Sequence, residues 1–280
     1  MVERLNNATG ALGALRYLQS ATKDLSGAES RLSSGLKVSR ARDDATSYHS
    51  AAIMRGQNGS LNAVTLSLGR AESISDTAIA AAEQISKQLI AMKGTAAQAM
   101  SEGLSDAQRD AFQQQYNDQM QTLQMFIRSA SFDDANILDG SKVPGGVSFI
   151  ADAEATQSVT LEGRNFMPGA SVIVAPPATN GLANTQAAAD THALLDQSIA
   201  NLGDQLIEMT AERKRIEAQK GFVGRLADAL AAGVGRMVDT DLAAESAMIQ
   251  ALQVKQELSA QSISIANSAP EALLSMFRPI

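Results

Sequence analysis

The side chains best suited to chemistry in this 280-residue chain are its two histidines, His49 and His192. An imidazole can serve as a general base or as a metal ligand near neutral pH. The two histidines lie in different helical regions of the sequence, outside any His-x-x-x-His pair, and the chain has neither a P-loop nor a nucleophile elbow. The chain also lacks cysteine, which removes thiolate catalysis and most zinc sites. We therefore predict no catalytic residue, no metal site and no cofactor.

Acidic side chains offer a second source of chemistry. The adjacent Asp43 and Asp44 could coordinate a cation, but helix-favouring sequence follows them, so a role in helix capping is the better interpretation. Asp152, Glu154 and Glu162 lie in a segment rich in proline and glycine and leave a remote alternative, an enzyme that uses acidic residues. No cluster of aromatic and polar residues near them suggests a pocket.

Sugar attachment is the remaining covalent chemistry that the sequence suggests. The tripeptides that begin at Asn7 and Asn58 match the Asn-glycosylation pattern, but both lie in predicted helix and are best explained by chance. Hydroxyl groups of the middle segment, among them Ser158 and Thr160, are better placed to carry a glycan.

Charge and hydropathy exclude several kinds of partner. The formal charge of −7 and the isoelectric point near 4.9 oppose nucleic-acid binding, which needs clustered cations. The densest basic stretch, residues 213–215, is interleaved with Glu208 and Glu217 and is interpreted as a solvated helix face. No apolar run approaches the ~18 residues that cross a bilayer, and the first residues lack the apolar core of a cleaved signal peptide.

Hydrophobic periodicity predicts the elements that hold these residues. Apolar or small residues recur in steps of three and four over residues 5–32, which predicts a helix that ends near Gly35. A second helix is expected from Asp43 and Asp44 to about residue 100, and a third over residues 105–127. The apolar positions of the first helix are Leu5, Ala8, Leu12, Leu15, Leu18, Thr22, Leu25, Ala28 and Leu32.

The sequence changes character in the middle and then returns to helix. Alternating runs at residues 147–151, 158–163 and 170–176 predict short strands, and helices follow at about 185–232 and 239–266. The fold class is therefore mainly α, a coiled-coil-like bundle of long helices formed by both chain ends, with a small β insertion in the middle.

The two ends of the chain are expected to pair. Each carries an apolar stripe with few charges, and the simplest way to bury both stripes is side by side, in a parallel or antiparallel pair. Residues 258–280 remain rich in large apolar side chains, and one partner helix cannot cover all of them. We therefore expect this tail to be dry only in an assembly of several copies and largely disordered in an isolated subunit.

Three segments carry a resemblance to a known family. The segment RLSSGLKVSRARDDA at residues 31–45 resembles the signature of bacterial flagellins, and residues 245–278 resemble the end of those proteins. FDDANILDG at residues 132–140 resembles the turn that closes their N-terminal helical region. The usual continuation after Asp-Asp-Ala is replaced here by residues 46–50, TSYHS, so local packing is expected to differ.

The resemblance implies a self-assembling filament subunit of the bacterial flagellum, secreted without a cleaved signal peptide. It implies an inner core of residues 1–38 and 238–280, a helical shell of residues 39–142 and 183–237, and an outer β-rich segment at 143–182. The implied partners are further copies of the chain, an export chaperone that binds the C-terminal region, and the filament cap and hook-junction proteins. Nucleic acid and membrane insertion are not expected.

Specific residues follow from the same resemblance and from the apolar stripes. The residues that we predict to contact other subunits are Arg31, Leu32, Gly35, Arg40, Arg42, Asp43, Asp44, Leu252, Ile263, Ile265, Leu273, Leu274, Met276 and Phe277. A hook-filament junction protein, which has similar terminal helices, is the main alternative function. The turn at residues 31–35 and the ending at residues 269–278 fit a flagellin better.

Overall fold

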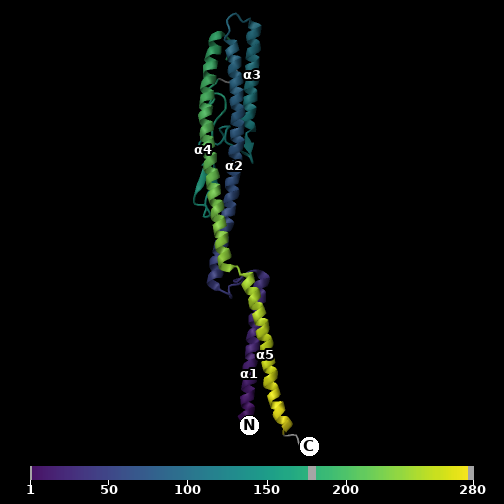
Figure 1. Ribbon diagram of the computed structural model, residues 1–280. Helices are drawn as coiled ribbons and strands as arrows, with labels where there is room; N and C mark the ends of the chain where they lie inside the picture. Colours follow the sequence, from purple (N-terminus) through teal and green to yellow (C-terminus); the bar gives the residue numbers. More distant parts are fainter. Residues whose placement is uncertain (1, 176–180, 277–280) are drawn as a thin grey trace. The chain divides into compact units, whose positions relative to one another are not determined.

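The computed structural model describes the backbone of residues 2–175 and 181–276, and the side chains of residues 12–175, 181–266 and 268 (Figure 1). Long helices dominate this part of the chain: α1 (Val2–Ser34), α2 (Ala45–Ala99), α3 (Asp106–Ser129), α4 (Thr185–Val238) and α5 (Leu242–Met276). The chain forms two compact units. Unit 1 contains Met1–Gly56 and Ala229–Ile280, and unit 2 contains Gln57–Asp228. The finer division at residues 38, 142, 182 and 237 stays a prediction.

Local sequence signals explain where the first three helices begin and end. Gly35 adopts φ +70° and its N–H bonds the carbonyl of Arg31 at 2.8 Å, which ends α1 at a position where a glycine avoids backbone strain. Ser105 and Gln108 form a reciprocal capping box at the start of α3. Asp44 accepts N–H bonds from Thr46 and Ser47 at the start of α2. The predicted ends of these helices are confirmed.

Unit 2 is built around a heptad-like core. Buried positions on α2 and α4 repeat in steps of three and four, or of seven, which is the period that keeps two helices in contact over many turns. On α2 they include Leu61, Val64, Leu68, Ala71, Ile74, Ala78, Ala82, Ile85, Leu89, Met92, Ala96 and Ala99. On α4 they include Ala188, Leu195, Leu202, Met209, Ile216 and Val223. Figure 1 shows α2, α3 and α4 lying side by side.

Helix α3 completes the bundle with one apolar face. Tyr116, Met120, Leu123 and Ile127 are fully buried, at the spacing that the sequence predicts. Burial raises the pKa of the Tyr116 hydroxyl to about 12. Phe112, which has the same helical spacing from Tyr116, is only half-buried.

Two short hairpins follow α3. The first pairs β1 (Ser131–Phe132) with β2 (Ala135–Asn136), and the second pairs β3 (Val147–Ile150) with β4 (Ser158–Leu161), both antiparallel. The second hairpin confirms two of the three predicted strands.

The predicted third strand at residues 170–176 is wrong over residues 170–175, where the chain is irregular; residue 176 lies outside the described residues. Backbone groups that would form a ladder instead bond to side chains of α4. The N–H groups of Val174 and Ala175 donate to the hydroxyl of Ser198 at 3.1 and 3.3 Å. The carbonyl of Val172 accepts from Asn201 at 3.2 Å. Because side chains of α4 bond these backbone groups, the segment packs on α4 without a partner strand.

The C-terminal helices also differ from the sequence-based boundaries. Helix α4 continues to Val238 instead of ending near residue 232, and α5 begins at Leu242 and continues past residue 266. Val234 and Val238 are buried in a small cluster of unit 1, so packing outweighs the weak helix propensity of Gly233 and Gly235.

Arg164 anchors the β insertion to α4. Its guanidinium is almost fully buried and donates to Glu212 at 2.7 Å, to Gln205 at 2.8 Å and to the carbonyl of Glu162 at 3.0 Å. Its own N–H bonds the carbonyl of Ile137 at 2.6 Å. Unit 2 therefore holds its irregular segment by a buried, fully bonded charge.

A matched pair of glycines tests this packing. Gly146 has φ +74°, and a Cβ added there would lie 1.9 Å from the carbonyl oxygen of Leu161, whereas a Cβ at Gly59 in α2 meets nothing within 4 Å. Gly146→Ala should lower the free energy of unfolding of unit 2 by about 2 kcal/mol or more. Gly59→Ala should raise it by about 0.5–1 kcal/mol. Chemical denaturation measures both, and equal effects would contradict the described approach of the two segments.

Candidate assembly surface

The two chain ends form an antiparallel helix pair within unit 1 (Figure 1). Arg31 of α1 contacts Glu245 near the start of α5, and Thr22 accepts a bond at 3.2 Å from Gln256 farther along it. Residue numbers thus fall along α1 as they rise along α5, so the two helices run in opposite directions. The beginning of α1 and the end of α5 therefore lie at the same end of the pair, which is the antiparallel one of the two orientations left open by the sequence.

The seam between α1 and α5 is narrow. On α1 only Ala21 and Ala28 are fully buried over residues 12–34, and their small side chains let the two backbones approach closely. The α1 seam consists of Ala14, Leu18, Ala21, Leu25 and Ala28, and the α5 seam of Glu245, Ile249, Leu252, Gln256, Ser259, Ile263 and Ala266. Both sets advance in steps of three and four, as in coiled coils.

This seam corrects the sequence-based stripe. Leu12, Leu15, Thr22 and Leu32 were expected to share one buried line with Leu18, yet all four are exposed. Because Ala21 and Ala28 face α5, α1 is rotated about its axis relative to the orientation that would bury these leucines. The leucines are left on the flank of the pair.

Large apolar side chains therefore remain in contact with water on both helices. The exposed members of this set, called the open flank, lie outside the seam on more than one side of each helix; they are Leu12, Leu15, Tyr17, Leu32, Leu242, Met248, Val254, Leu258 and Ile265. Scattered apolar residues are normal on a protein surface, but nine on one pair of helices indicate a surface that another chain covers.

The turn between α1 and α2 is tied to the connection between α4 and α5. The N–H of Lys37 bonds the carbonyl of Val238 at 2.7 Å, and the N–H of Thr240 bonds the carbonyl of Gly35 at 3.0 Å. Below these bonds lies a cluster of buried residues, Val38, Ala51, Val234 and Val238. The cluster fixes the turn at residues 35–44 against the end of α4.

A partly buried ion pair stands at the end of this turn. Two guanidinium nitrogens of Arg31 contact one carboxylate oxygen of Glu245, at 2.6 and 2.8 Å. The Glu245 side chain is only 11% exposed and that of Arg31 is 35% exposed, so the carboxylate depends on the pair more than the guanidinium does. Arg31 therefore acts within the chain. The sequence analysis missed its partner Glu245, since helical spacing does not reveal a contact between elements that are far apart in sequence.

Asp43 and Asp44 cap backbone groups on the exposed side of the turn. The Asp43 carboxylate accepts from Ser39 and from the N–H of Arg40, and these bonds lower its pKa, with the Ser39 hydroxyl contributing most. The Ser47 hydroxyl, which donates to Asp44 at 2.6 Å, lowers the pKa of Asp44 in the same way. The capping interpretation is thus supported by direct bonds. Arg40 and Arg42 lie exposed beside these caps.

The remaining predicted contact residues lie on or beyond α5. Leu252 and Ile263 are half-buried in the seam, and Ile265 is exposed on the open flank. The side chains of Leu273, Leu274 and Met276 lie outside the described side chains. Phe277 lies outside the described residues.

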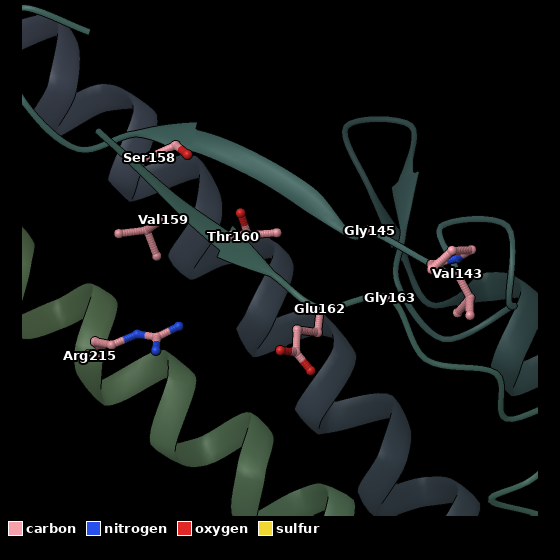
Figure 2. Close-up of a pocket in the computed structure, with 9 residues that line it drawn as sticks. Val143, Gly145, Ser158, Val159, Thr160, Glu162, Gly163 and Arg215 are labelled. Atoms are coloured by element: carbon pink, nitrogen blue, oxygen red, sulfur yellow. The ribbon is translucent and has the colours of Figure 1, made fainter. Parts of the chain in front are cut away.

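The β insertion in unit 2 contains the predicted sugar-attachment residues. Ser158 is exposed, whereas the Thr160 hydroxyl is shared with Ser148 at 3.0 Å. Both line a shallow hollow between β4, the turn at residues 143–145 and Arg215 of α4 (Figure 2). Asp152, a candidate of the enzyme alternative, instead closes a loop by accepting from Thr156 and from the N–H of Gln157, which lowers its pKa.

Two further features, a cluster of metal ligands and a membrane-spanning helix, are absent from the part of the chain that the structure describes. Among the described side chains, those of residues 12–175, 181–266 and 268, no three His, Asp or Glu gather as metal ligands. None of the described helices is both long and apolar enough to span a bilayer. His192 contacts Asp196 at 3.7 Å in unit 2, while His49 belongs to unit 1.

Comparison with known proteins gives a consistent result over nearly the whole chain. Residues 5–143 match the bacterial flagellin N-terminal helical region, and residues 192–277 match the bacterial flagellin C-terminal helical region. Flagellin FljJ of Caulobacter vibrioides is 34% identical, over 99% of this chain and 99% of that protein. A flagellin of Brucella melitensis is 30% identical, over 99% of this chain and all of its own length. The crystal structure of Bacillus cereus flagellin covers 55% of this chain and 86% of its own, with 20% identity and a TM-score of 0.45.

Replacing one or the other partner of the Arg31–Glu245 pair should reduce local stability by unequal amounts. Arg31→Met leaves a mostly buried carboxylate without its partner and should cost about 2–4 kcal/mol of local stability. Glu245→Gln leaves an Arg31 that water can solvate and should cost about 1 kcal/mol. Amide exchange in the assembled polymer at Val38 and Thr240, whose N–H groups bond across the turn, reports the opening free energy. A larger effect for Glu245→Gln would contradict the described burial.

The caps predict a pH dependence. Because the pKa of Asp44 is lowered in the folded chain, its contribution to stability is present above the ordinary value of 3.8 and is lost as the pH falls through the folded value. Acidification should therefore fray the first turn of α2, seen as backbone chemical-shift changes at Thr46 and Ser47. Asp44→Asn keeps a good helix cap but cannot titrate, so its shifts there should stay nearly constant. Equal acid fraying in both proteins would contradict this role.

Proposed function

Because the chain belongs to the bacterial flagellin family, and is therefore a structural subunit of the extracellular flagellar filament and not an enzyme, we propose how its ends contact other copies. The contact surface is the open flank of α1 and α5 together with the exposed turn at residues 40–44. Neighbouring copies cover the flank, and the charged turn forms ion pairs at its edge. This proposal extends to the predicted residues Leu252, Ile263, Leu273, Leu274, Met276 and Phe277.

The single observation that carries this proposal is the exposure of the open flank. An antiparallel pair buries one seam and leaves Leu258 and Ile265 more than half exposed, at 57% and 67%. Covering the exposed part of such a side chain contributes roughly 1 kcal/mol. Nine of these side chains on each copy can therefore supply much of the free energy that holds the subunits together. By the same argument, residues 1–38 and 238–280 of neighbouring copies would together form the inner core of the filament.

The geometry of the contact should be heterologous. A patch on one copy that meets a different patch on the next copy generates an open helical polymer, whereas self-complementary patches generate closed dimers. A role at the hook-filament junction is not favoured by the comparisons, in which full-length flagellins match the chain end to end.

Further parts of the proposal concern export and accessory partners. We propose, from the family resemblance alone, that the subunit leaves the cell without a cleaved signal peptide. An export chaperone that binds the apolar end of α5, and cap and hook-junction proteins that meet the filament ends, are proposed from family resemblance.

Sugar attachment in the outer segment, residues 143–182, is also a proposal. Ser158 is the better candidate because it is exposed on an edge strand and no described side chain holds its hydroxyl. Thr160 shares its hydroxyl with Ser148. Mass spectrometry of protein from its native cells tests both residues, and an unmodified peptide over residues 147–161 would refute this part.

Substitutions on α5 test the proposed contact surface. Leu258→Asp and Ile265→Asp should each raise the critical concentration for polymer growth by roughly tenfold or more, because a charge would be buried between copies. Gln253→Asp adds the same charge at an exposed polar position on another side of the same helix, about 140° around the axis from Leu258, and should have a smaller effect. Sedimentation of polymer from monomer measures all three. Equal polymerisation of Leu258→Asp and of the unaltered protein would contradict the proposal.

A further inference from the structure

Charge is distributed unevenly over the chain. Unit 2 carries 12 Lys and Arg against 20 Asp and Glu, a formal charge of −8, whereas unit 1 carries 11 against 10. Copies that pack their second units together should therefore repel one another, unless charges of opposite sign meet at the contacts. The arrangement of charge within unit 2 indicates where they can meet.

One end of unit 2 is acidic. The loop between α2 and α3 and the first turns of α3 expose Glu102, Asp106 and Asp110, called here the acidic tip. None of the three forms an ion pair within the described residues. The basic residue in this stretch, Arg109, is half-buried and donates to the carbonyl of Ala99 at 3.1 Å, at the end of α2.

A basic patch lies farther along α4. Lys214, Arg215 and Arg225 are exposed there, and the described residues offer none of them an ion pair, whereas Arg213 and Lys220 pair with acids of α2. The exposed acids of the same stretch are Glu217, which pairs with Arg213, and Asp228, so the cations still outnumber the acids. Lys214 and Arg225 are eleven residues apart and so share one side of the helix, with the exposed Phe222 close to the same side. An exposed aromatic ring among unpaired cations is typical of a protein contact surface.

The distance between tip and patch follows from the helix register. Ion pairs Lys93–Asp196, Asp76–Arg213 and Glu72–Lys220 align α2 and α4 as antiparallel neighbours. The patch is thus level with α2 residues near position 70, about 30 residues before the tip. At 1.5 Å per residue, tip and patch are separated by roughly 45–50 Å along the bundle.

We propose that the acidic tip of one copy docks on the basic patch of the next copy along the filament. The inference rests on the proposed polymer and adds a second, electrostatic contact to the apolar one between chain ends. Two different surfaces at separate levels of one unit give a head-to-tail contact, which repeats without closing. Contacting copies should then be displaced by roughly 45–50 Å along the bundle axis.

Charge reversal on each surface tests the docking. The patch variant is Lys214→Glu with Arg225→Glu, and the tip variant is Glu102→Lys with Asp110→Lys. Each variant alone, at low salt, should show a critical concentration for growth roughly tenfold or more above that of the unaltered protein, because like charges would meet. An equimolar mixture of the two variants should polymerise almost normally, since every tip then finds a patch of opposite charge.

Controls separate local pairing from net charge. Lys87→Glu with Arg128→Glu, at exposed residues outside both surfaces, changes the net charge as the patch variant does and should polymerise more readily than that variant. Glu83→Lys with Glu154→Lys is the equivalent control for the tip variant. The inference is overturned if the variants grow like their controls, or if the mixture fails to recover. Failure of the unaltered protein to polymerise would instead refute the polymer itself.

Discussion

The structure of this flagellin depends on one constraint: two helices packed against each other can each bury only one side. Helices α1 and α5 meet along a seam that includes Ala21 and Ala28, and this close contact leaves Leu12, Leu258 and Ile265 in water. Hydrophobic burial is the main force that orders a chain end. A pair with an uncovered apolar flank is therefore incomplete as a folded unit until other copies cover it.

Unit 2 contrasts with this incomplete pair. Its three helices surround a continuous heptad core, and the buried Arg164 ties the irregular segment to α4 through Glu212 and Gln205. Its described buried polar side chains are bonded within the unit, including Ser198, whose hydroxyl accepts from two backbone N–H groups. Unit 2 is thus stabilised by its own contacts, whereas we propose that unit 1 relies on assembly.

Sequence periodicity predicted the helices well because a 3.5-residue repeat imposes helix and packing together, as on α2 and α4. It predicted the antiparallel ends less fully, since Leu12, Leu15 and Ala21 all fit an apolar stripe and only packing decides which residues face the partner. The strand expected at residues 170–176 was wrong because Ser198 and Asn201, distant in sequence, satisfy its backbone. Glu245 was missed for the same reason, since its partner Arg31 lies at the other end of the chain.

Hydrogen exchange in α1 and α5, compared between dilute subunits and assembled polymer, shows whether the terminal helices become ordered only on assembly. We expect fast exchange over residues 12–34 and 246–266 in the free subunit, slow exchange there in the polymer, and slow exchange over the α2 core of unit 2 in both states. Strong protection of both terminal helices in a verified monomer would contradict this expectation, because the pair would then be stable without the surfaces of neighbouring copies.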